Sequence, residues 1–425
     1  MKKTLIFVVA IIVVATTLLL LPTPTNVSTQ EGNSFILGPV QIFDGENVIP
    51  ARYVEVREGY VSALHLEQPE SDLRLVDGNN NWLLPGLIDS HVHAWGDALQ
   101  QALPRGVTSV IDMFGDPAFL QEHTKHRDTA SAENLSADIY GAGLLMTAPH
   151  GHGTQFGIAV STLTSPEQAE ALVAERVAEG SDFIKIVYTR EGANYEHAPS
   201  ISLQGLRASI AAAHQFDRLA VVHISDHASA QDAVEAGADG LVHSFFDRVI
   251  STELLEMMVE NNVFVIPTMI VYEGMLRGEM NNEVLFNRED LNISRTAKAT
   301  LNRNFASSRF PENFYDNLLT TTKRMHAAGI PVLAGSDAPN PNTAHGWSLL
   351  VELLLLKKAG LSPEATLRAA TSVPADAFSL ADRGRIATGR KADFILLPQS
   401  PIENLETILT PTVVWKNGYR IDIRT

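Results

Sequence analysis

The strongest constraint on the fold is a repeated alternation in the middle of the chain. Runs rich in β-branched residues alternate there with amphipathic helical stretches such as SPEQAEALVAERVAEG and SLQGLRASIAAAHQF. Eight runs predict strands: LIDSHVHA, GVTSVIDM, SADIYGAGL, DFIKIVYT, LAVVHIS, GLVHSF, VFVIPTM and PVLAGSDA. Eight strand–helix units over this length are typical of a (β/α)₈ TIM barrel. A doubly wound open sheet is the competing architecture, but it usually needs fewer units, and the chain has no Gly-x-Gly-x-x-Gly fingerprint.

The two flanks of this alternating region have a different pattern. Residues 35–84 and 384–425 contain short alternating runs that Gly and Asp interrupt, which predicts antiparallel strands with tight turns. Neither flank has enough strands for a stable sheet of its own. We therefore expect an α/β protein with one barrel at 85–383 and one small β-sandwich domain built from both chain ends.

The connection after the seventh predicted strand is unusually long, from Met269 to about Thr320. Connections of that size are usually functional or contain helices of their own. Its position after the seventh strand makes this segment a candidate lid over the barrel mouth.

Residues 1–22, MKKTLIFVVAIIVVATTLLLLP, combine two lysines with a long apolar run, which is typical of an export segment. The run is long for a signal peptide, and no Ala-x-Ala cleavage site follows it. This favours a retained membrane anchor, with the rest of the chain on the periplasmic or extracellular side. If the segment is cleaved as a signal peptide, the protein would be periplasmic or secreted. Residues 23–34 then read as a polar linker.

Charge and cysteine content exclude several classes of function. The formal net charge is −17, which argues against nucleic acid as a partner, because phosphate binding needs a basic surface. The sequence has no cysteine, which excludes thiol nucleophiles, disulfides, iron–sulfur clusters and thiolate zinc sites. The expected partner is a small molecule. The membrane would be contacted only through the N-terminal segment. A homo-oligomer is compatible with the sequence.

Polar side chains recur where the predicted barrel strands end, and the active site of such a barrel lies at this face. Any one of them alone is more often structural, but their joint occurrence indicates a metal centre, since imidazole and carboxylate are the common Zn²⁺ ligands. In the His-x-His pair of the first strand both imidazoles point to the same side. The candidate ligands, in chain order, are His91, His93, Lys185, His223, His243 and Asp337.

Lys185 is the least expected member of this set. It lies among strongly apolar residues in Phe-Ile-Lys-Ile-Val, and a buried lysine is costly unless it is paired or modified. A lysine with a lowered pKa can react with CO₂ to form a carbamate, which is an anionic bridge between two metal ions. The alternative is an ordinary buried ion pair with a nearby acid.

The order of these candidates, with Leu-Pro-Gly-Leu-Ile-Asp-Ser before the His-x-His pair, resembles the amidohydrolase superfamily, in its binuclear subtype with a carboxylated lysine. The C-terminal stretch Gly-Arg-Ile-Ala-Thr-Gly-Arg-Lys-Ala-Asp-Phe-Ile-Leu-Leu also resembles that family's return into its small β domain. The resemblance implies a site with two divalent ions, expected to be Zn²⁺. Its implied ligands are His91, His93 and Asp337 for the first ion, His223 and His243 for the second, and the CO₂-derived carbamate of Lys185 as the bridge.

The resemblance also implies roles in catalysis. Asp337 would take a proton from the bridging hydroxide and pass it to the leaving group. His152 matches a loop motif of prolidase-like and imidazolonepropionase-related dipeptidases, and would polarise the scissile carbonyl or contact substrate. Arg190 would pair with a substrate carboxylate, and Tyr188 would donate a hydrogen bond to the oxyanion, although a structural role is an equal alternative for each. The roles of His150, Tyr195 and His345 stay open.

The implied function is the metal-dependent hydrolysis of a C–N bond, in a dipeptide or an N-acyl amino acid. The alternative is a hydrolase of cyclic amides, lactones or xenobiotic esters. A barrel that binds ligands without catalysis is a third reading, which the intact set of candidate ligands opposes.

Overall fold

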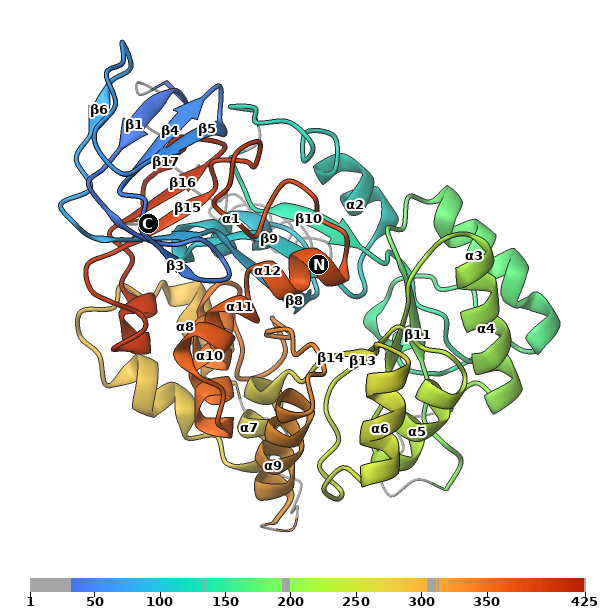
Figure 1. Ribbon diagram of the computed structural model, residues 1–425. Helices are drawn as coiled ribbons and strands as arrows, with labels where there is room; N and C mark the ends of the chain where they lie inside the picture. The colour runs from blue at the N-terminus through green and yellow to red at the C-terminus, as the bar shows by residue number, and fades with distance from the viewer. Residues whose placement is uncertain (1–31, 134, 193–198, 304–310, 312, 424–425) are drawn as a thin grey trace, which may run out of the picture.

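The computed structural model describes residues 32–133, 135–192, 199–303, 311 and 313–423 (Figure 1). The predicted export segment, residues 1–22, lies outside these residues, as does most of the linker that follows it. Within the described part of the chain, no helix is both long and apolar enough to cross a membrane. Export and membrane anchoring therefore stay predictions.

The centre of the molecule is a ring of parallel strands. Two parallel sheets, β10-β9-β8 and β11-β12-β13-β14, form most of it. Met146 pairs with β11, whereas Val332 pairs with β14 and Ala338 with β8, so the ring closes into a TIM-barrel-like fold. The strands of the two sheets are β8 Leu87–Val92, β9 Val107–Asp112, β10 Asp138–Gly141, β11 Ile184–Val187, β12 Ala220–His223, β13 Gly240–Val242 and β14 Phe264–Ile266.

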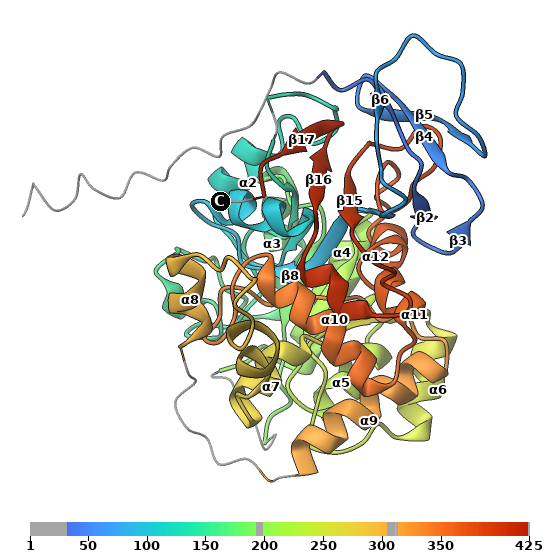
Figure 2. The same cartoon turned by 90° about the vertical axis from the view of Figure 1, so that its left-hand side faces the viewer.

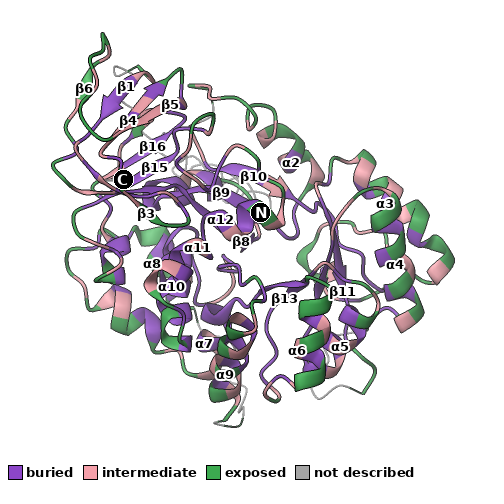
Figure 3. Cartoon of the chain, in the orientation of Figure 1, coloured by how far each residue is buried: buried purple, intermediate pink, exposed green. Residues whose placement is uncertain are grey.

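The barrel strands are buried on both faces, which Figure 3 shows as purple segments. Side chains fill the inside of the ring and helices cover the outside, so these strands read as continuous apolar runs rather than as alternating ones. Ile88, Ile111, Val221, Val242 and Leu333 come from different parts of the ring and belong to one apolar cluster.

Helices surround the ring (Figures 1 and 2). Several begin after a serine whose hydroxyl accepts a hydrogen bond from the first turn, as Ser202, Ser251 and Ser362 do. The helices are α1 Ala98–Ala102, α2 Pro117–His123, α3 Ala169–Ala178, α4 Leu203–Gln215, α5 His227–Glu235, α6 Thr252–Glu260, α7 Met269–Leu276, α8 Arg295–Leu301, α9 Asn313–Ala327, α10 Trp347–Ala359, α11 Pro363–Arg368 and α12 Ser372–Ala377.

The long connection after β14 contains helices of its own. It includes α7, a π-helix at Asn282–Phe286 and α8, while residues 304–310 and 312 lie outside the described residues. α7 packs against α9 and α10. The carboxylate of Glu352 on α10 accepts hydrogen bonds of 2.9 and 2.8 Å from the N–H groups of Met269 and Ile270, the first residues of α7. α7 is therefore fixed by packing and hydrogen bonds. The ring of Tyr272 on α7 lies 5.9 Å from that of His243 between centroids, so the start of the connection borders the barrel mouth, and the lid function stays a prediction.

Two further sheets form the β domain: one combines strands from both chain ends and the other consists of N-terminal strands. In Figure 2 the red C-terminal strands stand beside blue N-terminal ones. Their orders are β17-β16-β15-β7-β2-β3 and β5-β4-β1-β6. Phe35, Val54, Leu83, Phe394 and Trp415 belong to one apolar core that both sheets share. The strands are β1 Phe35–Leu37, β2 Gln41–Phe43, β3 Val48–Ile49, β4 Tyr53–Arg57, β5 Tyr60–His65, β6 Leu75–Val76, β7 Trp82–Pro85, β15 Phe394–Leu397, β16 Val413–Lys416 and β17 Tyr419–Ile421.

A buried ion cluster joins these C-terminal strands to the barrel. Its centre is Asp138, the first residue of β10. Asp138 Oδ2 lies 2.6 Å from Arg383 Nη1, 2.8 Å from Lys416 Nζ and 3.4 Å from Lys391 Nζ. Lys416 Nζ also lies 2.8 Å from Asp393 Oδ2. We refer to Asp138, Arg383, Lys391, Lys416 and Asp393 as the Asp138 cluster.

Candidate metal centre

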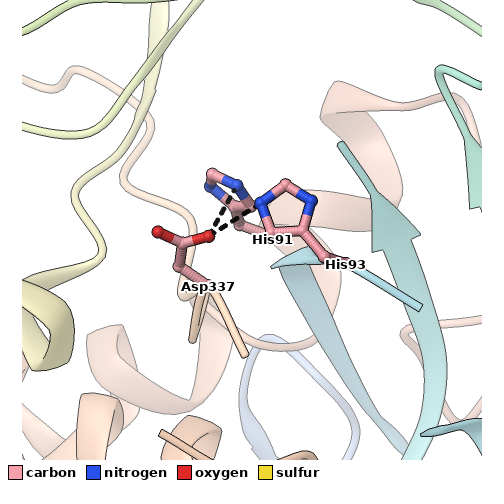
Figure 4. A group of neighbouring side chains, drawn as sticks. All are labelled: His91, His93 and Asp337. Carbon is pink, nitrogen blue, oxygen red and sulfur yellow. Dashed lines mark ion pairs between the residues drawn. The ribbon is translucent and has the colours of Figure 1, made fainter. Parts of the chain in front are cut away.

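Three predicted ligands converge where the first and eighth barrel segments end (Figure 4). Oδ1 of Asp337 lies 3.2 Å from His91 Nε2 and 3.0 Å from His93 Nε2. In a tetrahedral zinc site with bonds near 2.0 Å, ligand atoms are about 3.3 Å apart. In the described part of the chain no hydrogen bond satisfies the buried Asp337 Oδ1. The donor atoms and their spacing therefore fit a divalent metal ion.

Backbone and carboxylate contacts hold this pair of imidazoles. His93 Nδ1 lies 3.2 Å from the carbonyl oxygen of Phe114, which leaves Nε2 to face Asp337. The carboxylate of buried Asp89 accepts hydrogen bonds from the N–H and hydroxyl of Ser336, at 2.9 and 2.6 Å, and so ties the loop that carries Asp337 to β8. Burial raises the pKa of Asp89 to about 7, while the Ser336 hydrogen bonds oppose that shift. Asp89 is not among the predicted site residues, although a carboxylate inside an apolar strand was the available signal.

Two further predicted ligands adjoin this group. The ring centroids of His223 and His243 are 4.5 Å apart, and those of His243 and His91 are 5.0 Å apart. His243 Nδ1 lies 2.7 Å from the hydroxyl of Thr268, which orients the ring. His243 and Thr268 both have positive φ angles, of 70° and 45°. Such strain in non-glycine residues is concentrated at functional sites. Thr268 had no distinguishing sequence signal.

Lys185 lies on β11 and is only 3% exposed. Among the described residues its amine has no carboxylate within ion-pair distance, which argues against the ordinary buried ion pair. Burial lowers the pKa of Lys185 to about 7, and the negative charge of Asp337 opposes this shift. Burial first, and then the charge of Lys185, lower the pKa of His91 well below its usual value. His91 is thereby kept neutral, which is the form that binds metal.

The structure also locates the other histidines that the sequence analysis considered. His152 is half-buried, and its ring stacks on that of His223 with centroids 5.1 Å apart, so it borders the site. His150 is exposed. His345 is buried, and burial together with the charge of His93 lowers its pKa to about 4. Tyr195 lies outside the described residues.

The structure gives Tyr188 and Arg190 a different partner from the one predicted. The Tyr188 hydroxyl donates a 2.7 Å hydrogen bond to Asp232 on α5, and Arg190 donates to both oxygens of the same carboxylate, 2.6 Å from Nε to Oδ2. Asp232 is 4% exposed, so its charge needs these donors. Asp232 therefore engages both residues in this structure, and the roles of Arg190 as a substrate-carboxylate ligand and of Tyr188 as an oxyanion donor stay predictions.

A groove of about 580 Å³ lies at the opposite end of the barrel. Its lining includes Leu219, Asn262 and Ile330, which precede three barrel segments. The predicted ligands instead lie on the strands or just after their carboxyl ends, so this groove is separate from the metal centre. In barrels the amino-terminal face serves stability rather than chemistry.

Comparison with known proteins agrees with this geometry. Residues 82–421 match the amidohydrolase family. Ochratoxinase of Aspergillus niger is 22% identical over 396 residues, which cover 79% of this chain and 75% of that protein. Imidazolonepropionase of Deinococcus deserti is 36% identical over 103 residues, 23% of this chain and 26% of that protein.

A solved structure supports the fold. A Xaa-Pro dipeptidase with methionine bound in its active site superposes with a TM-score of 0.72 at 20% identity, covering 92% of this chain and 100% of that one. The family match confirms the resemblance inferred from the order of the candidate ligands. The chain thus belongs to the amidohydrolase family, as a metal-dependent hydrolase that acts on carbon–nitrogen bonds.

Proposed function

We propose that the chain hydrolyses the amide bond of a dipeptide or an N-acyl amino acid with the help of two divalent metal ions. The observation that carries this proposal is the convergence of His91, His93 and Asp337 beside the buried Lys185, whose amine has no ion-pair partner among the described residues. The relatives support the substrate class, since one is named for cleaving Xaa-Pro dipeptides. Zn²⁺ is the ion that this donor set suits best.

The residues divide into ligands for two ions. His91, His93 and Asp337 would hold the first, and His223 and His243 the second. The neutral amine of Lys185 would add to CO₂ and release one proton, and the oxygens of the resulting carbamate would serve as anionic ligands for the ions. A pKa of about 7 leaves a large neutral fraction for this reaction at physiological pH. When bound, such ions polarise a carbonyl group and make a water molecule more acidic.

Two residues of the chain would handle protons and charge during hydrolysis. Asp337 would accept a proton from the attacking water and donate it to the leaving nitrogen, so that the products are a carboxylate and an amine. His152 borders the site beside His223 and is half-buried, so it would hydrogen-bond the scissile carbonyl oxygen.

Metal analysis of Lys185→Ala tests this proposal. We expect the folded variant to lose most of its metal and roughly a thousandfold or more of its activity. Bicarbonate or a short carboxylic acid should partly restore activity, because it replaces the missing bridge. The matched control is Lys391→Met, which removes a buried lysine of the Asp138 cluster and should keep the metal.

Two outcomes would contradict the proposal. A folded Lys185→Ala protein with about two metals per chain would show that the lysine is no ligand bridge. In a panel of dipeptides, N-acyl amino acids, lactones and esters, turnover of lactones or esters without amides would exclude the proposed substrate class.

A further inference from the structure

Aromatic side chains at the barrel mouth form a closed circuit of neighbouring rings. Four of its members are candidate metal ligands, one is His152 and two are phenylalanines. The centroid distances around the circuit are 5.2 Å for His93–His91, 5.0 Å for His91–His243, 4.5 Å for His243–His223, 5.1 Å for His223–His152, 5.9 Å for His152–Phe156, 6.1 Å for Phe156–Phe114 and 6.3 Å for Phe114–His93.

The two phenylalanines make one side of this circuit apolar. Phe114 is 7% exposed and belongs to a small apolar cluster with Leu144, Leu145 and Val187. The ring of Phe156 lies against that of Phe114 and is 57% exposed. A single exposed apolar side chain is ordinary, but this ring contacts both Phe114 and His152 at the edge of the metal centre. A ligand that covers Phe156 would remove its exposed face from water.

The cation that was predicted to bind a substrate carboxylate already forms an ion pair within the protein. Arg190, the cation that the sequence suggested for a substrate carboxylate, is held by Asp232. Next to His93 and His152, the described residues offer an apolar surface made by Phe114 and Phe156. His152 contacts both Phe156 and His223, so the apolar surface and the metal ligands meet at this residue.

We propose that Phe114 and Phe156 form an aromatic wall that selects amide substrates with an aromatic group next to the scissile bond. The identity of the scissile bond rests on the proposed function; the wall itself rests on the ring geometry. His152 contacts both Phe156 of the wall and the candidate ligand His223. The aromatic group of the substrate therefore lies close to the carbonyl that is attacked. Aromatic rings pair edge-to-face or offset at the centroid distances found along this wall.

Matched substrates and one exposed side chain test this proposal. N-acetylphenylalanine or N-benzoylalanine should be hydrolysed with a kcat/KM about tenfold or more above that of N-acetylalanine. Phe156→Ala should remove most of that preference, mainly by raising KM for the aromatic substrates. Phe156→Tyr should retain the preference. The control is Leu66→Ala, since Leu66 is 66% exposed and lies beyond the end of β5 in the β domain.

Three outcomes of the substrate panel would overturn the aromatic wall. The first is equal kcat/KM values for the aromatic substrates and N-acetylalanine. The second is an equal loss of kcat/KM on aromatic substrates and on N-acetylalanine in Phe156→Ala. The third is equal turnover of N-acetylcyclohexylalanine and N-acetylphenylalanine. The last would show an apolar surface without aromatic selectivity.

A binding measurement separates this proposal from the proposed function. Calorimetry on the metal-loaded protein should give phenylacetate an affinity about tenfold or more above that of acetate, and Phe156→Ala should lose the difference. If this holds while no amide is cleaved, the aromatic wall stands and the proposed function fails. If amides are cleaved but phenylacetate and acetate bind equally, the wall fails and the proposed function stands.

Discussion

Two buried lysines, Lys185 at the barrel mouth and Lys416 at the junction with the β domain, have opposite electrostatic environments. Lys185 is 3% exposed and has no carboxylate within ion-pair distance in the described chain, and burial lowers its pKa to about 7. Lys416 is 0% exposed, but Asp138 and Asp393 each lie 2.8 Å from its amine, and their charges raise its pKa.

The difference shows that burial alone does not set the charge of a lysine. Desolvation disfavours the ammonium in both places, and only nearby carboxylates offset it. Lys391 is intermediate: it lies 3.4 Å from Asp138, yet burial lowers its pKa, and the charges of Lys416 and Arg383 add to that effect. A lysine with counter-ions holds two parts of the fold together, whereas one without them is available as a neutral amine.

The largest effect is expected at the Asp138 cluster. Asp138→Asn leaves Lys416, Lys391 and Arg383 buried without the charge that they share, which should lower the free energy of unfolding by about 3–5 kcal/mol. Urea denaturation measures this loss. The control is Asp376→Asn, because Asp376 is 66% exposed and its ion pair with Arg385 should contribute less than about 1 kcal/mol. Equal losses in the two variants would contradict the distinction between buried and exposed pairs.

A smaller effect is expected at the mouth, where hydrogen bonds aim the ligands. Thr268→Val removes the hydroxyl 2.7 Å from His243 Nδ1 at nearly constant volume, and should weaken metal retention about 10- to 100-fold. Metal content after dialysis against graded chelator concentrations measures this. Thr268→Ser should restore retention because it keeps the hydroxyl. If the serine variant loses as much metal as the valine variant, the hydroxyl does not position His243.

The smallest effect is a pH slope in the metal-free protein. Lys185 has a folded pKa of about 7 against 10.5 in a free chain, so between these values the unfolded chain binds more protons. The unfolding free energy of the metal-free protein should therefore rise with pH, by up to about 1.4 kcal/mol per pH unit. The pKa of Lys416 is raised instead, so its stabilising contribution is complete below pH 10.5 and is lost only as pH rises through the folded value.

Urea denaturation of metal-stripped protein between about pH 7.5 and 9.5 checks this prediction, since both lysines have their expected slopes in that window. Lys185→Met should remove the rise in stability, and Lys416→Met should lower stability by the same amount at every pH. The reverse assignment of the two slopes would contradict the electrostatic comparison.

Much of the architecture was predictable because its signals are local. Continuous apolar runs and helical periodicity indicated the parallel ring, and short alternating runs at both ends indicated shared sheets, which β7 and β15 form by pairing Leu83 with Leu396. The predicted ligands meet because parallel strands bring their carboxyl ends to one face. Residues that act on these ligands were missed: Thr268 reaches His243 only because β13 and β14 are neighbours in the ring.

The sequence by itself determined which residue types stand at the ends of the barrel strands, and that Lys185 and Lys416 both follow apolar residues, in Phe-Ile-Lys and Val-Trp-Lys. Only the tertiary structure decided that Asp232 engages Arg190, 42 residues earlier, and that Asp138 meets Lys416, 278 residues later. The physical reason is that Coulomb energy depends on separation in space and on local desolvation. The residues next to a lysine in the sequence specify neither its distance to other charges nor its desolvation. Two similar local patterns therefore yield a charged Lys416 and a Lys185 whose amine is readily neutral.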